Sequence, residues 1–307
     1  DLVILAEPPF LKSKLWRVDA VAAGQRMRIK DCDITLDGQL LGRLTEAENA
    51  LVTLRLQTRE ADPILLAEHS SVLELLPRNQ WGGLTSLPDM VAAFVQPNDP
   101  AIDKLLKQAA GLLRTSGKEA AINGYALGTK HAWEITSAIW SAVGALGLDY
   151  VLPPASFENL GQKVRSPSQI VDSGIGTCLD LALLFAALLE QAGLNPLLVF
   201  TQGHAFVGVW LKSEEFTTSV VDDITALRKR VKLKEMVLFE ATLTTQRSSP
   251  KFSYAAERGF EQIAESEEHE FELAVDIRRA RLQRIKPLSS SEAIAVSYTH
   301  LTLPTKA

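Results

Sequence analysis

The chain has 307 residues, of which 46% are hydrophobic and 22% are charged, and its net charge at pH 7 is −5. This composition is typical of a globular protein with a sizeable core, and it argues against a protein that coats nucleic acid. The apolar runs are too short for a membrane span, so we expect no membrane partner. The two cysteines, Cys32 and Cys178, are widely separated, which favours reduced thiols in a cytoplasmic protein over a disulfide framework.

Both ends of the sequence differ from ordinary termini. The chain begins at Asp1 inside a strand-like run, so we expect that an N-terminal piece of the first domain is missing. Residues 288–307 form a tail, and its last part, Val296–Ala307, resembles translated adapter read-through rather than native sequence. The tail therefore contributes no functional candidate.

Residues 1–85 predict an all-β domain. Polar and apolar residues alternate there in short runs that are separated by turn signals such as Asp37-Gly38. Strands at this spacing are typical of an antiparallel sandwich of the immunoglobulin-like type, which we interpret as a docking or spacer domain. The clearest runs are Leu15–Val18, Met27–Ile29, Leu51–Leu56 and Val72–Leu76.

A second, helix-rich domain is predicted over residues 86–287. A helix that ends near Leu113 should begin at Pro100, because Asp99 is a good capping residue and proline is favoured in the first helical position. Another helix, Lys130–Leu146, carries two tryptophans seven residues apart and hence on one face, which predicts a core-facing stripe.

The stretch after Gly174 carries the strongest candidates for chemistry. Thr177 and Asp180 form a Thr-x-x-Asp capping pattern, which predicts a buried helix that begins at Cys178 and stops at Gly193. The free N–H groups and positive dipole at a helix start favour a thiolate there. A strand and a short polar loop follow this helix, and His204 then opens the second strand.

A third strand, Met236–Thr242, places Glu240 among apolar neighbours, and a buried carboxylate of this kind needs a partner. The remainder, Ala255–Ile285, is predicted to be helical, with an acidic half followed by a basic half. The basic run Arg278–Lys286 is a weak candidate for nucleic-acid contact.

Cys178, His204 and Glu240 are the residue types that nucleophilic acyl transfer requires. The thiol must lose its proton to attack a carbonyl, an imidazole can take that proton, and a carboxylate can hold the imidazole in the correct tautomer. The backbone N–H of Cys178 and a side-chain amide could stabilise the oxyanion, and Gln162 is the preferred amide over Gln169. A packed core thiol and a structural histidine are the plainer alternatives, and no close-spaced ligand pair supports a metal site.

Three phrases of the sequence carry a family resemblance: Gly176–Asp180, Gly203–Phe206 and Phe239–Thr242. Together they resemble the transglutaminase-like branch of the papain-like cysteine fold, in which a Cys-headed helix packs on a small antiparallel sheet. The resemblance implies a nucleophile at Cys178, a base at His204 and an orienting acid at Glu240. It departs from the family pattern in having Glu rather than Asp as the acid, and Phe206 where Trp is common.

More narrowly, the span from Pro88 to Pro287 is similar to a domain near the N-terminus of large bacterial proteins that continue into helicase-type ATPase segments. The phrases Pro153–Glu158 and Asp276–Arg281 carry this closer similarity. It implies that the domain works within a multidomain protein, with nucleic-acid contacts supplied by the missing C-terminal part.

The sequence thus predicts an α+β protein in which a transglutaminase-like domain follows a β-sandwich. We expect thiol-dependent hydrolysis of a peptide or isopeptide bond in a protein or peptide substrate, without a cofactor or a metal. The contrasting prediction is a non-catalytic module that binds a protein partner or positions an associated ATPase.

Overall fold

The computed structural model describes residues 2–18, 21–31, 34–85, 87–152 and 161–288. Cys32 and the phrase Pro153–Glu158 lie outside the described residues. The chain divides into two compact units, the first ending at Arg78 and the second beginning at Asn79, shortly before the predicted boundary after residue 85.

The first unit contains one antiparallel sheet with the strand order β2-β1-β3-β4. Its elements are β1 (Leu2–Ala6), β2 (Lys14–Val18), α1 (Gly38–Arg43), β3 (Glu48–Thr58) and β4 (Leu65–Leu75). The predicted antiparallel strands are therefore present, except for Met27–Ile29, which is irregular. Within the described residues of this unit there is no second sheet, so the predicted sandwich is not seen. Alternation identifies a strand with two unlike faces, but it does not specify how many sheets the strands form.

The second unit carries all the candidate site residues, and its secondary structure is mixed. Its helical elements are η1 (Pro88–Phe94), α2 (Pro100–Thr115), α3 (Gly128–Gly144), α5 (Pro167–Ser173), α6 (Cys178–Gln191), α7 (Ile224–Lys232), η2 (Ala241–Thr245), α8 (Phe252–Glu261), η3 (Glu265–Glu270) and α9 (Ile277–Leu282), where η marks a 3-10 helix. Its strands are β5 (Gln80–Trp81), β6 (Asp149–Tyr150), β7 (Gln162–Lys163), β8 (Ile175–Gly176), β9 (Pro196–Thr201), β10 (His204–Trp210), β11 (Val220–Val221), β12 (Met236–Phe239) and β13 (Phe271–Asp276).

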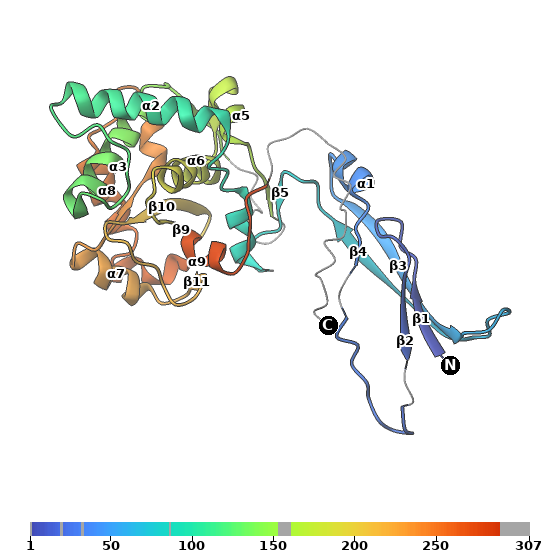
Figure 1. Cartoon of the computed structure of the whole chain (residues 1–307). Coiled ribbons are helices and arrows are strands. Elements are labelled where there is room, and N and C mark those ends of the chain that lie inside the picture. Colours follow the sequence, from blue (N-terminus) through green and yellow to red (C-terminus); the bar gives the residue numbers. More distant parts are fainter. Residues whose placement is uncertain (1, 19–20, 32–33, 86, 153–160, 289–307) are drawn as a thin grey trace, which may run out of the picture. The chain divides into compact units, whose positions relative to one another are not determined.

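A five-stranded antiparallel sheet, in the order β11-β13-β9-β10-β12, forms the centre of this unit. Helices α2, α3 and α6 pack on one face around a large apolar core, and α7 covers the other face with a smaller core (Figure 1). None of the helices in the described residues combines the length and apolar character that a bilayer crossing requires.

Helix α6 is the buried helix that the capping pattern predicts, and its start at Cys178 is confirmed. The Thr177 hydroxyl accepts from the Asp180 N–H at 3.1 Å, and the Asp180 carboxylate accepts from the Thr177 N–H at 3.1 Å. Gly193, with a φ of 79°, follows the helix end. The helix is buried on all sides because it lies between the sheet and the outer helices, so its sequence shows no polar stripe.

The prediction of continuous helix over Ala255–Ile285 is wrong. Residues Phe271–Asp276 form β13, which pairs with β9 on one side and β11 on the other. The charged residues around it favour a helical pattern locally, but Ala274 and Val275 are fully buried inside the sheet. Tertiary pairing thus overrides the local preference in this segment.

Gly259 allows α8 to approach the strand that leads to Glu240. A Cβ at this position would lie 2.5 Å from the backbone N and Cα of Phe239. We predict that Gly259→Ala lowers the free energy of unfolding by about 1–3 kcal/mol, because backbone atoms would have to shift to admit the methyl group. Chemical denaturation of the variant measures this loss.

Gly111 of α2 provides the matched control, because no atom of the part of the chain that the structure describes lies within 4 Å of the position that its Cβ would take. Gly111→Ala should be neutral or stabilise the protein by up to about 1 kcal/mol. Equal effects of the two substitutions would contradict the close approach of α8 to β12.

Candidate active site

Cys178 occupies the first position of α6, and its side chain is fully buried. The strand β8 and a capping box hold this helix start in place. β8 ends two residues earlier, and the Thr177–Asp180 capping box closes the first turn. The Asp180 carboxylate, itself 0% exposed, also accepts from the Arg165 backbone N–H and its guanidinium at 2.8 Å each. The nucleophile candidate therefore sits on a rigid helix start.

His204 begins β10 and meets Glu240, which directly follows β12. The imidazole Nε2 lies 2.7 Å from a carboxylate oxygen of Glu240. β10 and β12 are neighbours in the sheet, with Val207 paired to Phe239, so residues at the adjacent strand ends come together. Because Nε2 is occupied by Glu240, Nδ1 is the ring nitrogen left for the thiol, and His204 does interact with the Cys178 side chain. The structure thus brings the three predicted residues into one site.

Two further residues, to which the sequence analysis assigned no role, hold the Glu240 carboxylate. One oxygen accepts from the backbone N–H of Thr242 at 2.9 Å and from its hydroxyl at 2.7 Å. The other oxygen accepts from His204 and from the side-chain amide of Gln262, the residue that directly follows α8. Glu240 is 10% exposed at its side chain, so these donors replace water around a nearly buried charge.

The pKa values of the pair move in opposite directions. Burial acts to lower the pKa of His204, but hydrogen bonds and charge from Cys178 and Glu240 raise it to about 10. Burial acts to raise the pKa of Glu240, but the hydrogen bond and charge of His204 outweigh it and hold this pKa below its usual range. The imidazole therefore keeps its proton, and the carboxylate its charge, at neutral pH.

The shifted pKa values of His204 and Glu240 determine the pH range over which each group stabilises the fold. Since the His204 pKa is raised above its ordinary value of 6.5, its contribution is complete below that pH and is lost as the pH rises toward about 10. The contribution of Glu240 is complete above the ordinary pKa of 4.5 and is lost as the pH falls through its lowered folded-state pKa. Both contributions are greatest on the mildly acidic side of neutrality.

Tyr150 is a site residue that the sequence analysis missed. Its pKa is raised to about 12, chiefly by burial and by the charge of Cys178, and it interacts with both the side chain and the backbone N–H of Cys178. The pair β6–β8 places it there, because Tyr150 is paired with Gly176 in a two-residue parallel ladder. Strands of two residues leave no periodic pattern in a sequence, so this neighbour could not be found there.

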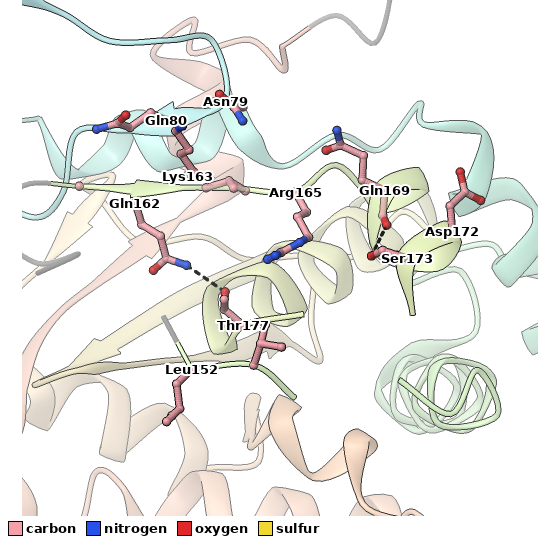
Figure 2. Close-up of a pocket in the computed structure, with 13 residues that line it drawn as sticks. Asn79, Gln80, Leu152, Gln162, Lys163, Arg165, Gln169, Asp172, Ser173 and Thr177 are labelled. Atoms are coloured by element: carbon pink, nitrogen blue, oxygen red, sulfur yellow. Dashed lines mark hydrogen bonds between the residues drawn. The ribbon is translucent and has the colours of Figure 1, made fainter. Parts of the chain in front are cut away.

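The two glutamines proposed for the oxyanion site have different environments. Gln162 is 3% exposed and donates its side-chain amide to the Thr177 hydroxyl at 2.9 Å, directly before Cys178 (Figure 2). Among the described residues, its buried Oε1 has no hydrogen-bond partner. Gln169 instead belongs to the capping box of α5, where its Oε1 accepts from the Ser166 N–H at 2.8 Å.

A cleft of about 1050 Å³ borders this site (Figure 2). Its lining includes Gln162 and Thr177, together with Val151 and Leu152. Cys178 itself does not line the cleft, although the residue before it does. The buried thiol is therefore adjacent to a space that could hold a substrate, but is closed off from it.

The basic run near the end of the domain is partly used for internal contacts. Arg281 binds both oxygens of Glu190 at 2.8 and 2.9 Å and donates to the carbonyl of Ala92 at 2.8 Å. Arg279 donates to the carbonyl of Thr217 at 2.7 Å. These guanidinium groups bind the protein's own backbone and acids, and nucleic-acid contact through this run stays a prediction.

Comparison of the chain with protein families, curated proteins and solved structures finds no match. What the site can do chemically follows from its own geometry. A thiol at a helix start, an imidazole beside it and a carboxylate behind the imidazole are suited to proton transfer coupled to nucleophilic attack.

Proposed function

We propose that the second unit catalyses thiol-dependent acyl transfer, with Cys178 as nucleophile, His204 as the proton-transfer group and Glu240 as the orienting acid. The observation that supports this proposal best is the 2.7 Å contact between Nε2 of His204 and Glu240, which leaves the other ring nitrogen for the thiol at the start of α6. The four donors around Glu240 further support a carboxylate built to fix an imidazole.

The reaction that we propose starts from a thiolate and an imidazolium. The sulfur attacks the carbonyl carbon of an amide, an S–C bond forms, and the carbonyl electrons move to oxygen. As the oxyanion collapses, the C–N bond breaks and the imidazolium gives its proton to the leaving amine. Water then attacks the thioester, His204 takes its proton, and the acid product leaves with the thiolate restored.

We further propose that the second unit is a transglutaminase-like domain of papain-like type. The Cys-headed helix on an antiparallel sheet, with the three residues in the order Cys, His and acid, supports this proposal. The substrate that we propose is a peptide or isopeptide bond of a cytoplasmic protein, and the resemblance suggests that the domain acts beside a helicase-type ATPase.

The amide of Gln162 is the proposed side-chain donor to the oxyanion. A 180° turn about its Cγ–Cδ bond would let the Thr177 hydroxyl donate to Oε1 and would place Nε2 where the unpaired oxygen now lies. The turn would remove one buried unpaired acceptor and supply a buried donor next to Cys178. A developing oxyanion would then accept from this donor.

We predict that Gln162→Leu lowers kcat by roughly 10²- to 10³-fold, the usual effect of removing one oxyanion donor. Gln169→Leu is the matched control, because it removes an amide that caps α5 and should affect stability more than kcat. Steady-state kinetics of both variants measure the difference. Equal losses of kcat would exclude Gln162 from the oxyanion site.

One observation favours the alternative function of a non-catalytic interaction module. Cys178 has no exposed surface, and a reacting thiol must be reached by its substrate. In this alternative, His204 and Glu240 form a structural pair and the neighbouring cleft binds a partner segment without cleaving it.

Hydrolysis of a fluorogenic peptide library and of an isopeptide-linked peptide by the full chain distinguishes the two functions. Turnover that is lost in Cys178→Ala, and retained when Cys32 is replaced by serine, would support the enzyme. Binding of a library peptide with equal affinity to the wild type and to Cys178→Ala, without any cleavage, would support the module.

A further inference from the structure

A cavity of about 490 Å³ lies between α3, α7, α8 and the strand β12 (Figure 1), and pockets that hold small molecules are typically about 300–1000 Å³. Among the described residues, it shares no lining residue with the cleft beside the Cys178 site. β12 is the last strand of its sheet, so a cavity at this edge meets the apolar cores of both faces. Val237 belongs to the larger core and Met236 to the smaller one. The cavity is therefore a candidate site in its own right.

The inside of this cavity is apolar. Three of its lining residues are at most 5% exposed, namely Leu211, Met236 and Val237. Three others are only partly buried, namely Trp133, Val231 and Ala256. The Trp133 ring packs against Phe252 with ring centroids 4.8 Å apart, which joins α3 to α8. A ligand with an apolar body would cover the partly exposed side chains, and removal of this surface from water favours binding.

The charged residues of the cavity favour an anion. Lys130, Lys234 and Glu257 line it and are exposed. Within the part of the chain that the structure describes, neither lysine forms a salt bridge, and Glu134, four residues further along α3 than Lys130, is paired with Lys118 at 3.0 Å. Two positive charges and one negative charge leave a single positive charge at the cavity. A ligand with one negative charge is complementary to it.

Lys234 is in a backbone conformation that glycine adopts more easily. Its φ is 57°, and it directly follows Leu233, the C-cap of α7, at a position where glycine is usual. The Lys234 N–H donates to the Val231 carbonyl at 2.9 Å, which closes the turn. A lysine here costs stability relative to glycine, and its side chain lines the cavity. Costs of this kind are concentrated at functional positions.

We propose that this cavity binds a small monocarboxylate with an apolar body, aromatic or aliphatic. The body lies against Trp133, Val231 and Ala256, and the carboxylate pairs with the amines of Lys130 and Lys234. A protein partner fits less well, because a stable interface takes roughly 20–30 residues from each side, whereas eleven line this cavity. This inference goes beyond the proposed function and does not depend on the chemistry of Cys178.

Titration calorimetry of the full chain with 4-phenylbutyrate and with octanoate tests the proposal. We expect both acids to bind saturably, and the neutral 4-phenylbutanamide to bind at least about threefold more weakly than 4-phenylbutyrate, because it lacks the charge. Binding of 4-phenylbutyrate should also change the tryptophan fluorescence, and this change should be lost in Trp133→Phe. Absence of saturable binding by either acid, or equal affinities for the acid and its amide, would overturn the proposal.

The variant with both Lys130→Gln and Lys234→Gln should bind the acids roughly five- to twentyfold more weakly and the amide as before. Lys232→Gln is the matched control, because Lys232 is an exposed lysine of α7 that does not line the cavity, and it should leave every affinity unchanged. Lys234→Gly should weaken binding of the acids without lowering the midpoint of thermal unfolding, which separates loss of the amine from loss of the fold. Wild-type affinity for the acids in the double variant would contradict the site.

Discussion

Replacing His204 with alanine should slow the alkylation of Cys178 by roughly 10²- to 10⁴-fold, the range that a positioned proton-transfer group contributes. The imidazole, with a pKa raised to about 10, stays positively charged at neutral pH and pairs with the sulfur. Without the imidazolium, the sulfur would lose the cation that His204 places beside it. The second-order rate constant for iodoacetamide at pH 7, measured in a Cys32→Ser background, checks this expectation.

His269 supplies the control for this substitution. It forms a similar contact with a glutamate, Nε2 to Glu270 Oε1 at 3.0 Å, but its side chain is 69% exposed. His269→Ala removes a surface histidine that is likewise paired with a glutamate, and it should leave the alkylation rate unchanged. Equal rates for wild type and His204→Ala would contradict the pairing of thiol and imidazole.

The second large effect is expected from Glu240→Ala, which leaves the four donors of its site without their acceptor. Removal of one partner from a buried ion pair typically costs about 3–5 kcal/mol, and the 10% exposure of this side chain places it in that class. The pKa of His204 should also fall from about 10 toward the ordinary value, because Glu240 contributes both a hydrogen bond and a negative charge. Chemical denaturation and the alkaline limit of the alkylation profile measure the two effects.

Glu270→Ala, which breaks the exposed pair with His269, is the corresponding control and should cost no more than about 1 kcal/mol. The isosteric Glu240→Gln should recover much of the lost stability but not the high His204 pKa, because its amide carries no charge. A stability loss in Glu240→Ala as small as that of Glu270→Ala would show that the carboxylate does not hold the imidazole.

Much of the local structure around the site was predictable from single residues. Asp99 and Pro100 fixed the start of α2, and the Thr177–Asp180 box fixed the start of α6, because capping uses side chains within four positions of one another. The strand β13 was not predictable in this way. Its sequence, FELAVD, lies among acidic residues, and only its place between β9 and β11 makes it a strand.

The site itself was predictable in its three central residues but not in their surroundings. Cys178, His204 and Glu240 were found because each has the chemistry of one role and because the phrases around them resemble a family. Gln262 and Tyr150 have no such signature, and Thr242 lies in the phrase Phe239–Thr242 but had no role assigned to it. The roles of these residues depend on the contacts made by η2, by the end of α8 and by β6. The burial of the thiol likewise results from packing and not from the residues next to it.

The most direct test of the coupling between thiol, imidazole and carboxylate is a titration of the His204 ring by NMR between pH 5 and 11. His204→Ala identifies its signals among those of the five histidines. In the wild type, we expect the imidazolium to persist until about pH 10, and in Cys178→Ala to lose its proton at lower pH, because the thiol contributes to the raised pKa. A ring that titrates near pH 6.5 in both proteins would contradict the proposed site.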